Sequence, residues 1–395
     1  MKIAFLTAGG IAPCLSSSIG FLLKEYYDYD SETEFIGYLN GYKGLLKGDS
    51  IRLSYNDINV INSFGGSFLG NSRVKLTNVK DCVKNNYISK NEDPLEVAAN
   101  QLINDNIDVL HTIGGDDTNT TAGDLVKYIE KKGHKIIVVG LPKTIDNDVI
   151  PIKQTLGAYT AAEQSAVFFE NIVNENTTSS RQLIIHEVMG RNCGWLTAFS
   201  AFLYKKKLEL KTFLPQLNLD KIKWDIHAIY IPEIDIDLDK ESLRLKEIMN
   251  QYDCVNIFLS EGAGLDTIIN EMKKNNEKIE YDAFGHVRID EINPGMWFAK
   301  HFKDSLNADK VLVQKSGYFA RSAAPNKTDI ELIEKSANKA FECAINKESG
   351  VIGIHEISNK IECINFSEIK GGKKFDVKSN WFVELYEEIN ESIQK

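Results

Sequence analysis

Apolar and polar residues follow one another along this chain at the spacings of short strands and amphipathic helices, most clearly between positions 107 and 148. Apolar runs at 107–113 and 135–141 predict two buried strands, and each ends in a cluster of Gly, Asp, Lys and Thr. Four apolar residues between them recur at the i, i+3, i+4, i+7 spacing of one helix face. They are Ala122, Leu125, Val126 and Ile129. Gly133 stands where a C-terminal cap is expected, so the stretch predicts a β-α-β unit.

Two acidic clusters follow the strands of this unit. They are Gly114-Gly115-Asp116-Asp117 and Asp146-Asn147-Asp148. Parallel strands joined by a crossover helix place their carboxyl ends at the same edge of the sheet, where open α/β folds bind ligands. We therefore expect both clusters to face one crevice.

The same patterns predict further elements on both sides of this unit. Strands are expected at 2–6, 35–39, 182–188, 227–231, 254–259 and 310–314. Helices are expected at 16–26, 94–102, 157–173, 240–252 and 294–306, and after position 191. Beyond about position 326, two amphipathic helices surround a short strand at 361–366, whereas 267–282 is charged, weakly patterned and expected on the surface. With 395 residues, the chain is long enough for two domains.

The two acidic clusters suit the chemistry of phosphate groups. Glycines between a strand and a helix let backbone N–H groups approach phosphate oxygens, and the helix N-terminus favours an anion. Four carboxylates would repel a phosphate unless a hard cation lay between them, so Asp116 and Asp148 indicate Mg²⁺ shared with substrate phosphates. Asp146 is then available as a base, and Lys143 supplies the positive charge that phosphoryl transfer requires. The alternative is ordinary polar turns, and the presence of two such clusters on successive strands argues against it.

Several segments resemble the phosphofructokinase family. The two clusters, read as GGDD and PKTIDND, look like its active site, and the similarity runs from residue 1 to about residue 325. Four further motifs agree with it. They are Gly9-Gly10 with the loop to Ser16, Phe68-Leu69-Gly70-Asn71-Ser72-Arg73, Met189-Gly190-Arg191 and Ser260-Glu261-Gly262-Ala263-Gly264. The resemblance implies an α/β fold of two doubly wound, Rossmann-like lobes with the active site in the cleft between them.

The resemblance also implies how the chain is divided and which parts bind which substrate. Residues 1–155 with about 292–345 form the expected donor lobe, and residues 156–291 with about 346–395 form the sugar-phosphate lobe. In the donor lobe, Gly10 and Arg73 are expected to contact phosphate groups, and Thr144 belongs to the catalytic and substrate-binding set.

The identity of the donor depends on two positions. Within the family, GGDG and a glycine before TIDND mark the users of ATP, whereas Asp117 and Lys143 resemble the pyrophosphate-dependent branch. A carboxylate at 117 fills the space that the α-phosphate of a nucleotide needs and repels its charge. Lys143 can stabilise the charge that develops on the leaving phosphate of pyrophosphate.

The resemblance assigns a second group of residues to fructose 6-phosphate. Met189 and Gly190 are expected beside the sugar ring, and Arg191 faces its phosphate. Glu261 is expected to bind the sugar hydroxyls, and Tyr318 with Arg321 closes over the substrate. Two arginines fit the family pattern less well. Arg181 stands one place out of register and Arg288 is shifted, so a contact of either with the sugar phosphate is left open.

Composition excludes several other functions. The net charge of −10, without any run of Lys or Arg, argues against a nucleic-acid surface. No apolar run approaches the length of a membrane span, and the chain begins with a strand pattern rather than a signal peptide, which predicts a cytoplasmic protein. Six scattered cysteines indicate neither a zinc site nor a disulfide framework, and most are expected to fill the core.

The resemblance therefore predicts an enzyme of glycolysis and gluconeogenesis. It would transfer a phosphoryl group reversibly, with Mg²⁺, from pyrophosphate to the 1-hydroxyl of fructose 6-phosphate, as a homo-oligomer and most simply a dimer. Two alternatives are an ATP-dependent kinase of the same fold and a non-catalytic ligand sensor. The intact Thr144-Ile145-Asp146-Asn147-Asp148 argues against the sensor, which needs no base. Sedoheptulose 7-phosphate as an additional acceptor, allosteric regulation and the role of the C-terminal segment are left open.

Overall fold

The computed structural model describes residues 1–280 and 292–391, and the chain divides into two compact units. Unit 1 comprises Met1–Ala161 and Arg321–Lys373, and unit 2 comprises Ala162–Ala320 and Lys374–Lys395. The chain passes from one unit to the other at the ends of these segments. Each unit contains its own sheet and its own hydrophobic core.

Unit 1 is built on a seven-stranded sheet in the order β11-β10-β5-β4-β1-β2-β3. The strands are β1 Lys2–Thr7, β2 Glu34–Tyr38, β3 Ser50–Arg52, β4 Val109–Gly114, β5 Ile137–Pro142, β10 Gly350–Ile354 and β11 Ile361–Ile364. The strands from β2 to β10 run parallel, and only the edge strands β3 and β11 are antiparallel. All six residues of β4 are buried, as expected for a parallel strand that helices cover on both faces.

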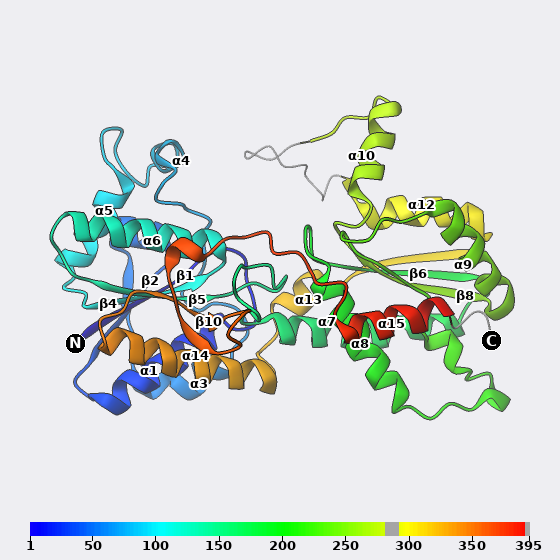
Figure 1. Ribbon diagram of the computed structural model, residues 1–395, viewed down its shortest axis with the longest axis horizontal. Helices are drawn as coiled ribbons and strands as arrows, with labels where there is room; N and C mark the ends of the chain where they lie inside the picture. The colour runs from blue at the N-terminus through cyan, green and yellow to red at the C-terminus, as the bar shows by residue number, and fades with distance from the viewer. Residues whose placement is uncertain (281–291, 392–395) are drawn as a thin grey trace. The chain divides into compact units, whose positions relative to one another are not determined.

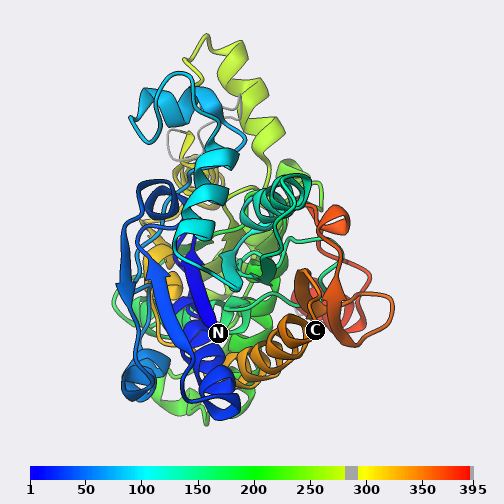
Figure 2. The same ribbon diagram turned by 90° about the vertical axis from the view of Figure 1, so that its left-hand side faces the viewer.

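Helices cover both faces of this sheet (Figure 1). Those on one face are α1 Leu15–Tyr29, α3 Ile58–Ser63 and α14 Lys327–Ile345; those on the other are α5 Pro94–Asn104 and α6 Asp116–Lys131. Figure 2, in which unit 1 faces the viewer, shows α1 and α14 lying side by side. Short helices are found at α2 Tyr42–Lys47 and α4 Val79–Lys84, and α7 Ala158–Ile172 spans the junction with unit 2.

Unit 2 is built on a fully parallel sheet in the order β7-β8-β6-β9. The strands are β6 Gln182–Val188, β7 Ala228–Tyr230, β8 Cys254–Ser260 and β9 Lys310–Lys315. The helices are α8 Trp195–Glu209, α9 Leu238–Tyr252, α10 Leu265–Lys274, α12 Pro294–Leu306, α13 Gly317–Arg321 and α15 Asn380–Glu391. α8 and α15 cover one face, and α9 and α12 cover the other (Figure 1). Two parallel-rich sheets, each between helices, confirm the predicted α/β fold class.

Local sequence signals explain where the helices of unit 1 begin and end. Asp93 caps α5 by accepting a hydrogen bond from the N–H of Leu95 at 2.9 Å, and Pro94 occupies the first turn. The four apolar residues predicted on one face of α6 are all buried. Gly133 follows α6 with φ of +79°, the left-handed conformation that glycine adopts without strain.

The division of the chain differs from the predicted one at two places. Helix α12 packs on β6 and β9 with Phe298 and Phe302 in the core of unit 2, so 292–320 does not return to unit 1. Residues 346–373 belong to unit 1 instead, because β10 pairs with β5 and extends that sheet. Sequence periodicity shows that a helix has an apolar face, but it does not show which of the two sheets that face packs on.

Several short elements were not predicted from the sequence patterns, among them β3, α3 and α4. Glycine-rich 40–48 contains α2, the weakly patterned segment from 267 contains most of α10, and β10 precedes the one strand predicted near the C-terminus. Each is short or largely exposed, so its apolar periodicity is weak.

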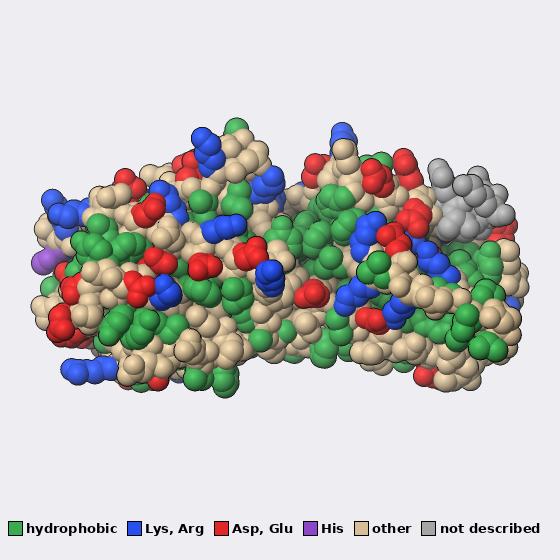
Figure 3. Space-filling view, turned by 90° about the horizontal axis from the view of Figure 1, so that it is seen from below, with side chains coloured by type: hydrophobic (Ala, Val, Ile, Leu, Met, Phe, Trp, Pro, Cys, Tyr) green, Lys and Arg blue, Asp and Glu red, His purple; other side chains and the backbone are tan. Residues whose placement is uncertain are grey.

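One face of the molecule shows how charged side chains are distributed. Lys and Arg side chains are interspersed with Asp and Glu on the face shown in Figure 3, and neither sign dominates it. Among the described residues, no helix combines the length and the apolar character needed to cross a membrane.

Candidate active site

Three neighbouring strands of unit 1 end at the same edge of the sheet. Thr7 of β1 pairs with Ile113 of β4, and Gly114 of β4 pairs with Pro142 of β5. The N–H of Lys143 donates to the carbonyl of Gly114 at 2.8 Å. The segments that follow the three strands are therefore neighbours in unit 1, as the parallel topology predicted. They are Ala8-Gly9-Gly10, Gly115-Asp116-Asp117 and Lys143–Asp148.

Lys143 is buried at this edge and its charge is directed at the first glycine turn. Its side chain is 4% exposed, and Nζ donates to the carbonyl oxygen of Gly10 at 2.6 Å. Burial lowers the pKa of Lys143 to about 8; nearby Arg321 also lowers it, whereas Asp146 and Asp148 favour the charged form. A cation held at the glycine turn with few water contacts is suited to an anionic ligand.

Arg321 lies against the same turn. Its Nε donates to the carbonyl of Ile11 at 3.0 Å, and a Cβ atom at Gly10 would lie 2.3 Å from Nη2. Gly10 is therefore required for this close approach of the guanidinium. The structure thus brings together Lys143 and Arg321 at one turn of unit 1, while Tyr318, the expected partner of Arg321, belongs to unit 2.

Carboxylates gather at the same edge. Burial raises the pKa of Asp116, and the negative charges of Asp117 and Asp148 raise it further. Asp117 pairs with Lys75, with Nζ 2.7 Å from Oδ1, and its side chain is 64% exposed. Asp116 and Asp148 thus form a candidate metal pair whose mutual repulsion a cation would relieve.

Asn147 fixes the backbone of the loop that carries Asp146 and Asp148. It is 3% exposed and has φ of +56°, and its Oδ1 accepts a hydrogen bond from the N–H of Thr155 at 2.9 Å. The hydroxyl of Thr155 donates to the carbonyl of Thr144 at 2.8 Å, and the N–H of Asp146 donates to the hydroxyl of Thr144 at 3.2 Å. The positions of both aspartates are therefore set by a fixed turn.

Sequence reasoning missed two residues of this site, because it assigned no chemistry to the region after 326. The backbone of Gly371 approaches the carboxylate of Asp116, and the N–H of Lys373 donates to the carbonyl of Asp148 at 2.9 Å. The run Lys370-Gly371-Gly372-Lys373-Lys374 was a signal that could have been recognised, since glycines beside lysines are typical of phosphate sites.

The predicted sugar-binding residues of unit 2 also follow neighbouring strands. β6 lies between β8 and β9, so the residues that follow these strands share one edge. They are Met189, Gly190 and Arg191 after β6, Glu261 after β8 and Tyr318 after β9. Tyr318 is 70% exposed.

Close backbone packing shapes this edge of unit 2. Oε1 of Glu261 accepts a hydrogen bond from the N–H of Gly190 at 3.3 Å, and the hydroxyl of Ser260 donates to the carbonyl of Gly190 at 2.5 Å. Gly190 has φ of +131°, and a Cβ at Gly262 would lie 1.8 Å from the carbonyl oxygen of Arg191. Both glycines are therefore required where they stand.

The other arginines considered in the sequence analysis do not all lie at these two edges. The carbonyl of Ser72 accepts a hydrogen bond from the N–H of Gly9 at 2.9 Å, which places exposed Arg73 next to the first glycine turn. Arg181 precedes β6, at the opposite end of the strand from Met189, and its Nε donates to the carbonyl of Asn307 at 2.6 Å. Arg288 lies outside the described residues.

A parallel sheet whose strands end in glycine turns beside a carboxylate pair and a buried ammonium defines a class of α/β proteins that hold phosphate groups. The particular family follows from comparison with known proteins. The chain belongs to the phosphofructokinase family, because the family model "Phosphofructokinase" matches residues 2–344.

Individual relatives are similar over nearly the whole chain. The chain is 52% identical to the pyrophosphate–fructose 6-phosphate 1-phosphotransferase of Methylotuvimicrobium alcaliphilum, over 99% of this chain and 97% of that protein. It is 51% identical to the protein of the same name from Propionibacterium freudenreichii subsp. shermanii, over 99% and 98% of the two chains. The crystal structure of a pyrophosphate-dependent phosphofructokinase from Marinobacter aquaeolei has a similar fold, with a TM-score of 0.71, 21% identity, and coverage of 98% of this chain and 92% of that one.

Proposed function

We propose that this protein transfers a phosphoryl group from pyrophosphate to the 1-hydroxyl of fructose 6-phosphate, giving fructose 1,6-bisphosphate and phosphate. The reaction follows from membership of the family and from 52% identity to a pyrophosphate–fructose 6-phosphate 1-phosphotransferase. The observation that carries the choice of donor is the presence of Asp117 at the start of α6 and of buried Lys143 at the turn of Gly10.

Pyrophosphate suits this edge of unit 1 because cations surround a confined glycine turn. Lys143 and Arg321 are both held against residues 10 and 11, where each can bind oxygens of the donor. Asp117 adds negative charge at the start of α6, beside the place where a longer nucleotide chain would continue. We therefore expect ATP to be disfavoured as a donor.

The carboxylate ligands at this edge suit Mg²⁺ as the cofactor. Magnesium is commonly bound by one or two carboxylates together with substrate phosphates, so a larger protein cage is not required. Asp116 and Asp148 provide two carboxylates. Burial raises the pKa of Asp116, and the charges of Asp117 and Asp148 raise it further. When bound there, the ion would neutralise charge on the transferring phosphoryl group.

Asp146 is the proposed base. It lies two residues from Asp148 in a turn fixed by Asn147, so a hydroxyl near the metal-bound phosphate would be within its reach. Asp146 would accept the proton of the 1-hydroxyl as the new P–O bond forms. Lys143 would stabilise the phosphate that leaves.

The residues at the edge of unit 2 are proposed to bind the sugar. Arg191 and Tyr318 would contact the phosphate of fructose 6-phosphate, Met189 and Gly190 would lie along the ring, and Glu261 would accept hydrogen bonds from its hydroxyls. The proposal is supported by the common edge of β6, β8 and β9. The predicted contact of Arg321 with this substrate stays a prediction, as does the cleft between the lobes.

A donor assay tests the function directly. Purified protein is incubated with fructose 6-phosphate, Mg²⁺ and equal concentrations of pyrophosphate or ATP, and fructose 1,6-bisphosphate is measured with aldolase. We expect product with pyrophosphate, and pyrophosphate formation in reverse from fructose 1,6-bisphosphate and phosphate. Turnover with ATP alone, or binding of fructose phosphates without any turnover, would contradict the proposal.

The same assay with sedoheptulose 7-phosphate addresses the alternative acceptor.

We also propose a cytoplasmic homodimer, as predicted from the sequence. Light scattering on the purified protein would show twice the chain mass of 44.4 kDa.

A further inference from the structure

The C-terminal segment 370–373 runs beside the loop that carries Asp148. The N–H of Ile150 donates to the carbonyl of Lys370 at 2.7 Å, and the N–H of Lys370 donates back to the carbonyl of Ile150 at 3.1 Å. The N–H of Lys373 donates to the carbonyl of Asp148 at 2.9 Å. Three backbone hydrogen bonds therefore attach this segment to the loop.

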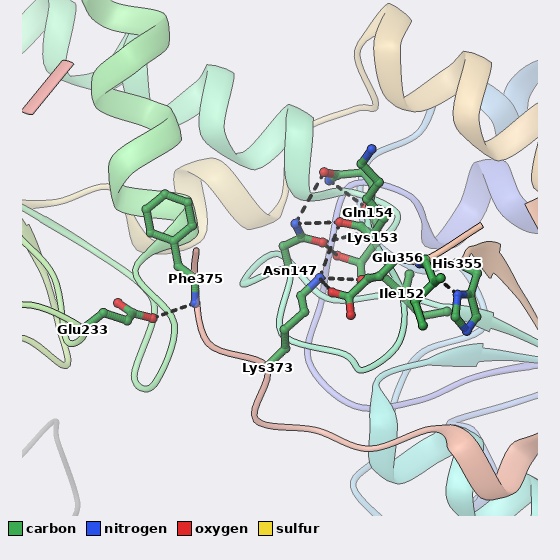
Figure 4. A network of polar contacts seen from close by, with 11 residues as sticks. Asn147, Ile152, Lys153, Gln154, Glu233, His355, Glu356, Lys373 and Phe375 are labelled. Atoms are coloured by element: carbon green, nitrogen blue, oxygen red, sulfur yellow. Dashed lines mark hydrogen bonds and ion pairs between the residues drawn. The ribbon is translucent and has the colours of Figure 1, made fainter. Parts of the chain in front are cut away.

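The side chain of Lys373 fastens the same loop (Figure 4). Its ammonium donates to the carbonyl of Ile152 and, at 3.4 Å, to that of Lys153. It also pairs with Glu356 at 3.4 Å, and its side chain is only 14% exposed. The N–H of Glu356 donates to the carbonyl of Pro151 at 2.9 Å, so C-terminal residues hold the loop from two sides.

Gly371 touches the other candidate metal ligand. A Cβ atom at Gly371 would lie 2.1 Å from Oδ2 and 2.7 Å from Cγ of Asp116. The backbone of Gly371 does not have the left-handed conformation that requires glycine, so the need for glycine is one of space. Its neighbour Gly372 is the opposite case, because it has φ of +82° and a Cβ atom there would meet no other atom within 4 Å.

We propose that residues 370–373 are a positioning element of the donor site, which sets the separation between the Asp116 and Asp148 carboxylates. Gly371 limits where the carboxylate of Asp116 can lie, and Lys373 holds the backbone of Asp148. The inference rests on the proposed function, in which these two carboxylates bind Mg²⁺. It gives the C-terminal segment a role in holding the two carboxylates.

Metal binding tests this role separately from turnover. Mn²⁺ is titrated into the protein in the presence of imidodiphosphate, a pyrophosphate analogue, and free Mn²⁺ is measured by electron paramagnetic resonance. In Gly371→Ala the added methyl group displaces the carboxylate of Asp116, and we expect the Kd for Mn²⁺ to rise about tenfold. The KM for pyrophosphate should rise in parallel, and the KM for fructose 6-phosphate should stay within about twofold.

Two comparison variants make the outcome decisive. Lys370→Ala removes an exposed side chain of the same segment and leaves its backbone and Asp116 untouched, so its Kd should match that of the wild type. Asp116→Asn should weaken Mn²⁺ binding at least as much as Gly371→Ala. If Asp116→Asn binds Mn²⁺ normally, the metal assignment itself fails. If Asp116→Asn loses Mn²⁺ affinity while folded Gly371→Ala keeps it, or if Lys370→Ala is as impaired as Gly371→Ala, the positioning role is wrong.

Lys373→Met tests the positioning role without changing Gly371. It removes the hydrogen bonds to Ile152 and Lys153 but leaves every residue of the metal pair in place. We expect a smaller rise in the Kd for Mn²⁺, with thermal unfolding still cooperative. A folded Lys373→Met protein with unchanged Mn²⁺ affinity would overturn the part assigned to Lys373.

A second and separate feature is a pair of thiols at the other side of unit 1. Ligand atoms of Cys343, Glu348 and Cys363 lie within 4.8 Å of one another. Cys343 is in the last turn of α14, and the N–H of Glu348 donates to its carbonyl at 2.8 Å after a left-handed turn at Lys347. Cys363 comes from β11, so two separate parts of the chain meet here.

The surroundings favour metal ligation by these thiols. Cys343 is buried and Glu348 is exposed, so the group opens to solvent on one side. A Cβ atom at Gly350 would lie 2.6 Å from Sγ of Cys363, so glycine leaves the sulfur its room.

We infer that Cys343, Cys363 and Glu348 form a site for a thiophilic divalent cation of the zinc class. Thiolate and carboxylate ligands suit Zn²⁺, and water would occupy the fourth position. The thiol protons are released to solvent on binding. Such an ion would join the end of α14 to β11 and stabilise unit 1, independently of the catalytic proposal.

Cobalt substitution tests this site. Reduced wild-type protein is titrated with Co²⁺, and we expect a sulfur-to-metal charge-transfer band that saturates at about one equivalent. Cys343→Ser and Cys363→Ser should lose the band, and Cys254→Ser, a buried cysteine of unit 2, should keep it. Absence of the band in reduced wild-type protein, or its persistence in both single variants, would overturn the inference. So would rapid loss of two thiols to hydrogen peroxide without any Co²⁺ binding, which would identify a redox pair instead.

Discussion

The two units use the same edge of a parallel sheet in different ways. In unit 1 this edge gathers charge. Burial raises the pKa of Asp116, and the charges of Asp117 and Asp148 raise it further; burial lowers the pKa of Lys143, and Arg321 lowers it further. In unit 2 the edge is shaped mainly by backbone, with Gly190 and Gly262 packed against neighbouring segments. Glu261 there accepts a hydrogen bond from the backbone N–H of Gly190.

This difference indicates a division of work. Concentrated charge can stabilise a transition state and move a proton, whereas a closely fitted backbone recognises the shape and hydroxyl groups of a substrate. Substitutions at the edge of unit 1 should therefore lower kcat or raise the KM for pyrophosphate. Substitutions at the edge of unit 2 should raise the KM for fructose 6-phosphate.

Asp146→Asn should cause the largest loss. Removal of a positioned general base lowers kcat by about 10²- to 10⁴-fold, while an amide of the same size preserves the fixed turn. The two KM values should stay within a few-fold. Steady-state kinetics with both substrates measure this, with Asn147→Asp as a control that alters the turn instead of the base. A kcat within tenfold of the wild type would remove Asp146 from its role.

Lys143→Met should lower kcat by about 10²-fold or more, because the buried ammonium would stabilise the leaving phosphate. Methionine has a similar length and suits a buried position, so the fold should be retained. The KM for fructose 6-phosphate should change little. If Lys143→Met altered only the KM for fructose 6-phosphate, the division of work between the two edges would be wrong.

The protonation of Lys143 predicts a pH dependence. With a pKa of about 8, the ammonium is present below that pH and is lost as pH rises through it. We therefore expect kcat/KM for pyrophosphate to fall above about pH 8 in the wild type, at a fixed concentration of the magnesium complex. Lys143→Met, which has no such proton, should lack this fall. Identical profiles in both proteins would refute the assignment.

Glu261→Gln should have a smaller and more selective effect. Loss of the charge weakens hydrogen bonds from the sugar hydroxyls, and we expect the KM for fructose 6-phosphate to rise about tenfold. The KM for pyrophosphate should stay constant, in contrast to the variants of unit 1. Isothermal titration with fructose 6-phosphate alone gives an independent measure of the same loss.

The sequence predicted the parts of this site that local patterns determine. Asp116, Lys143 and Asp148 follow apolar runs of strand length, and parallel topology requires such residues to share an edge. The cap at Asp93 and the buried face of α6 were confirmed for the same reason, since each is set by neighbours in the sequence.

Other features depend on contacts between distant parts of the chain. Gly371 lies far from Asp116 in sequence, and only the folded chain brings its backbone to that carboxylate. Helix α12 was predicted with its observed bounds but assigned to the wrong unit, because its apolar face would suit either sheet. The position of Arg321 beside Gly10 likewise had no local signal.

The donor preference of Asp117→Gly tests the central claim most directly. The ratio of kcat/KM for pyrophosphate to that for ATP is measured in wild type and variant under the same Mg²⁺ concentration. We expect the variant to lose severalfold activity with pyrophosphate and to gain turnover with ATP, because the space and charge beside the start of α6 have changed. An unchanged ratio in a folded variant would contradict the account of how this chain selects pyrophosphate.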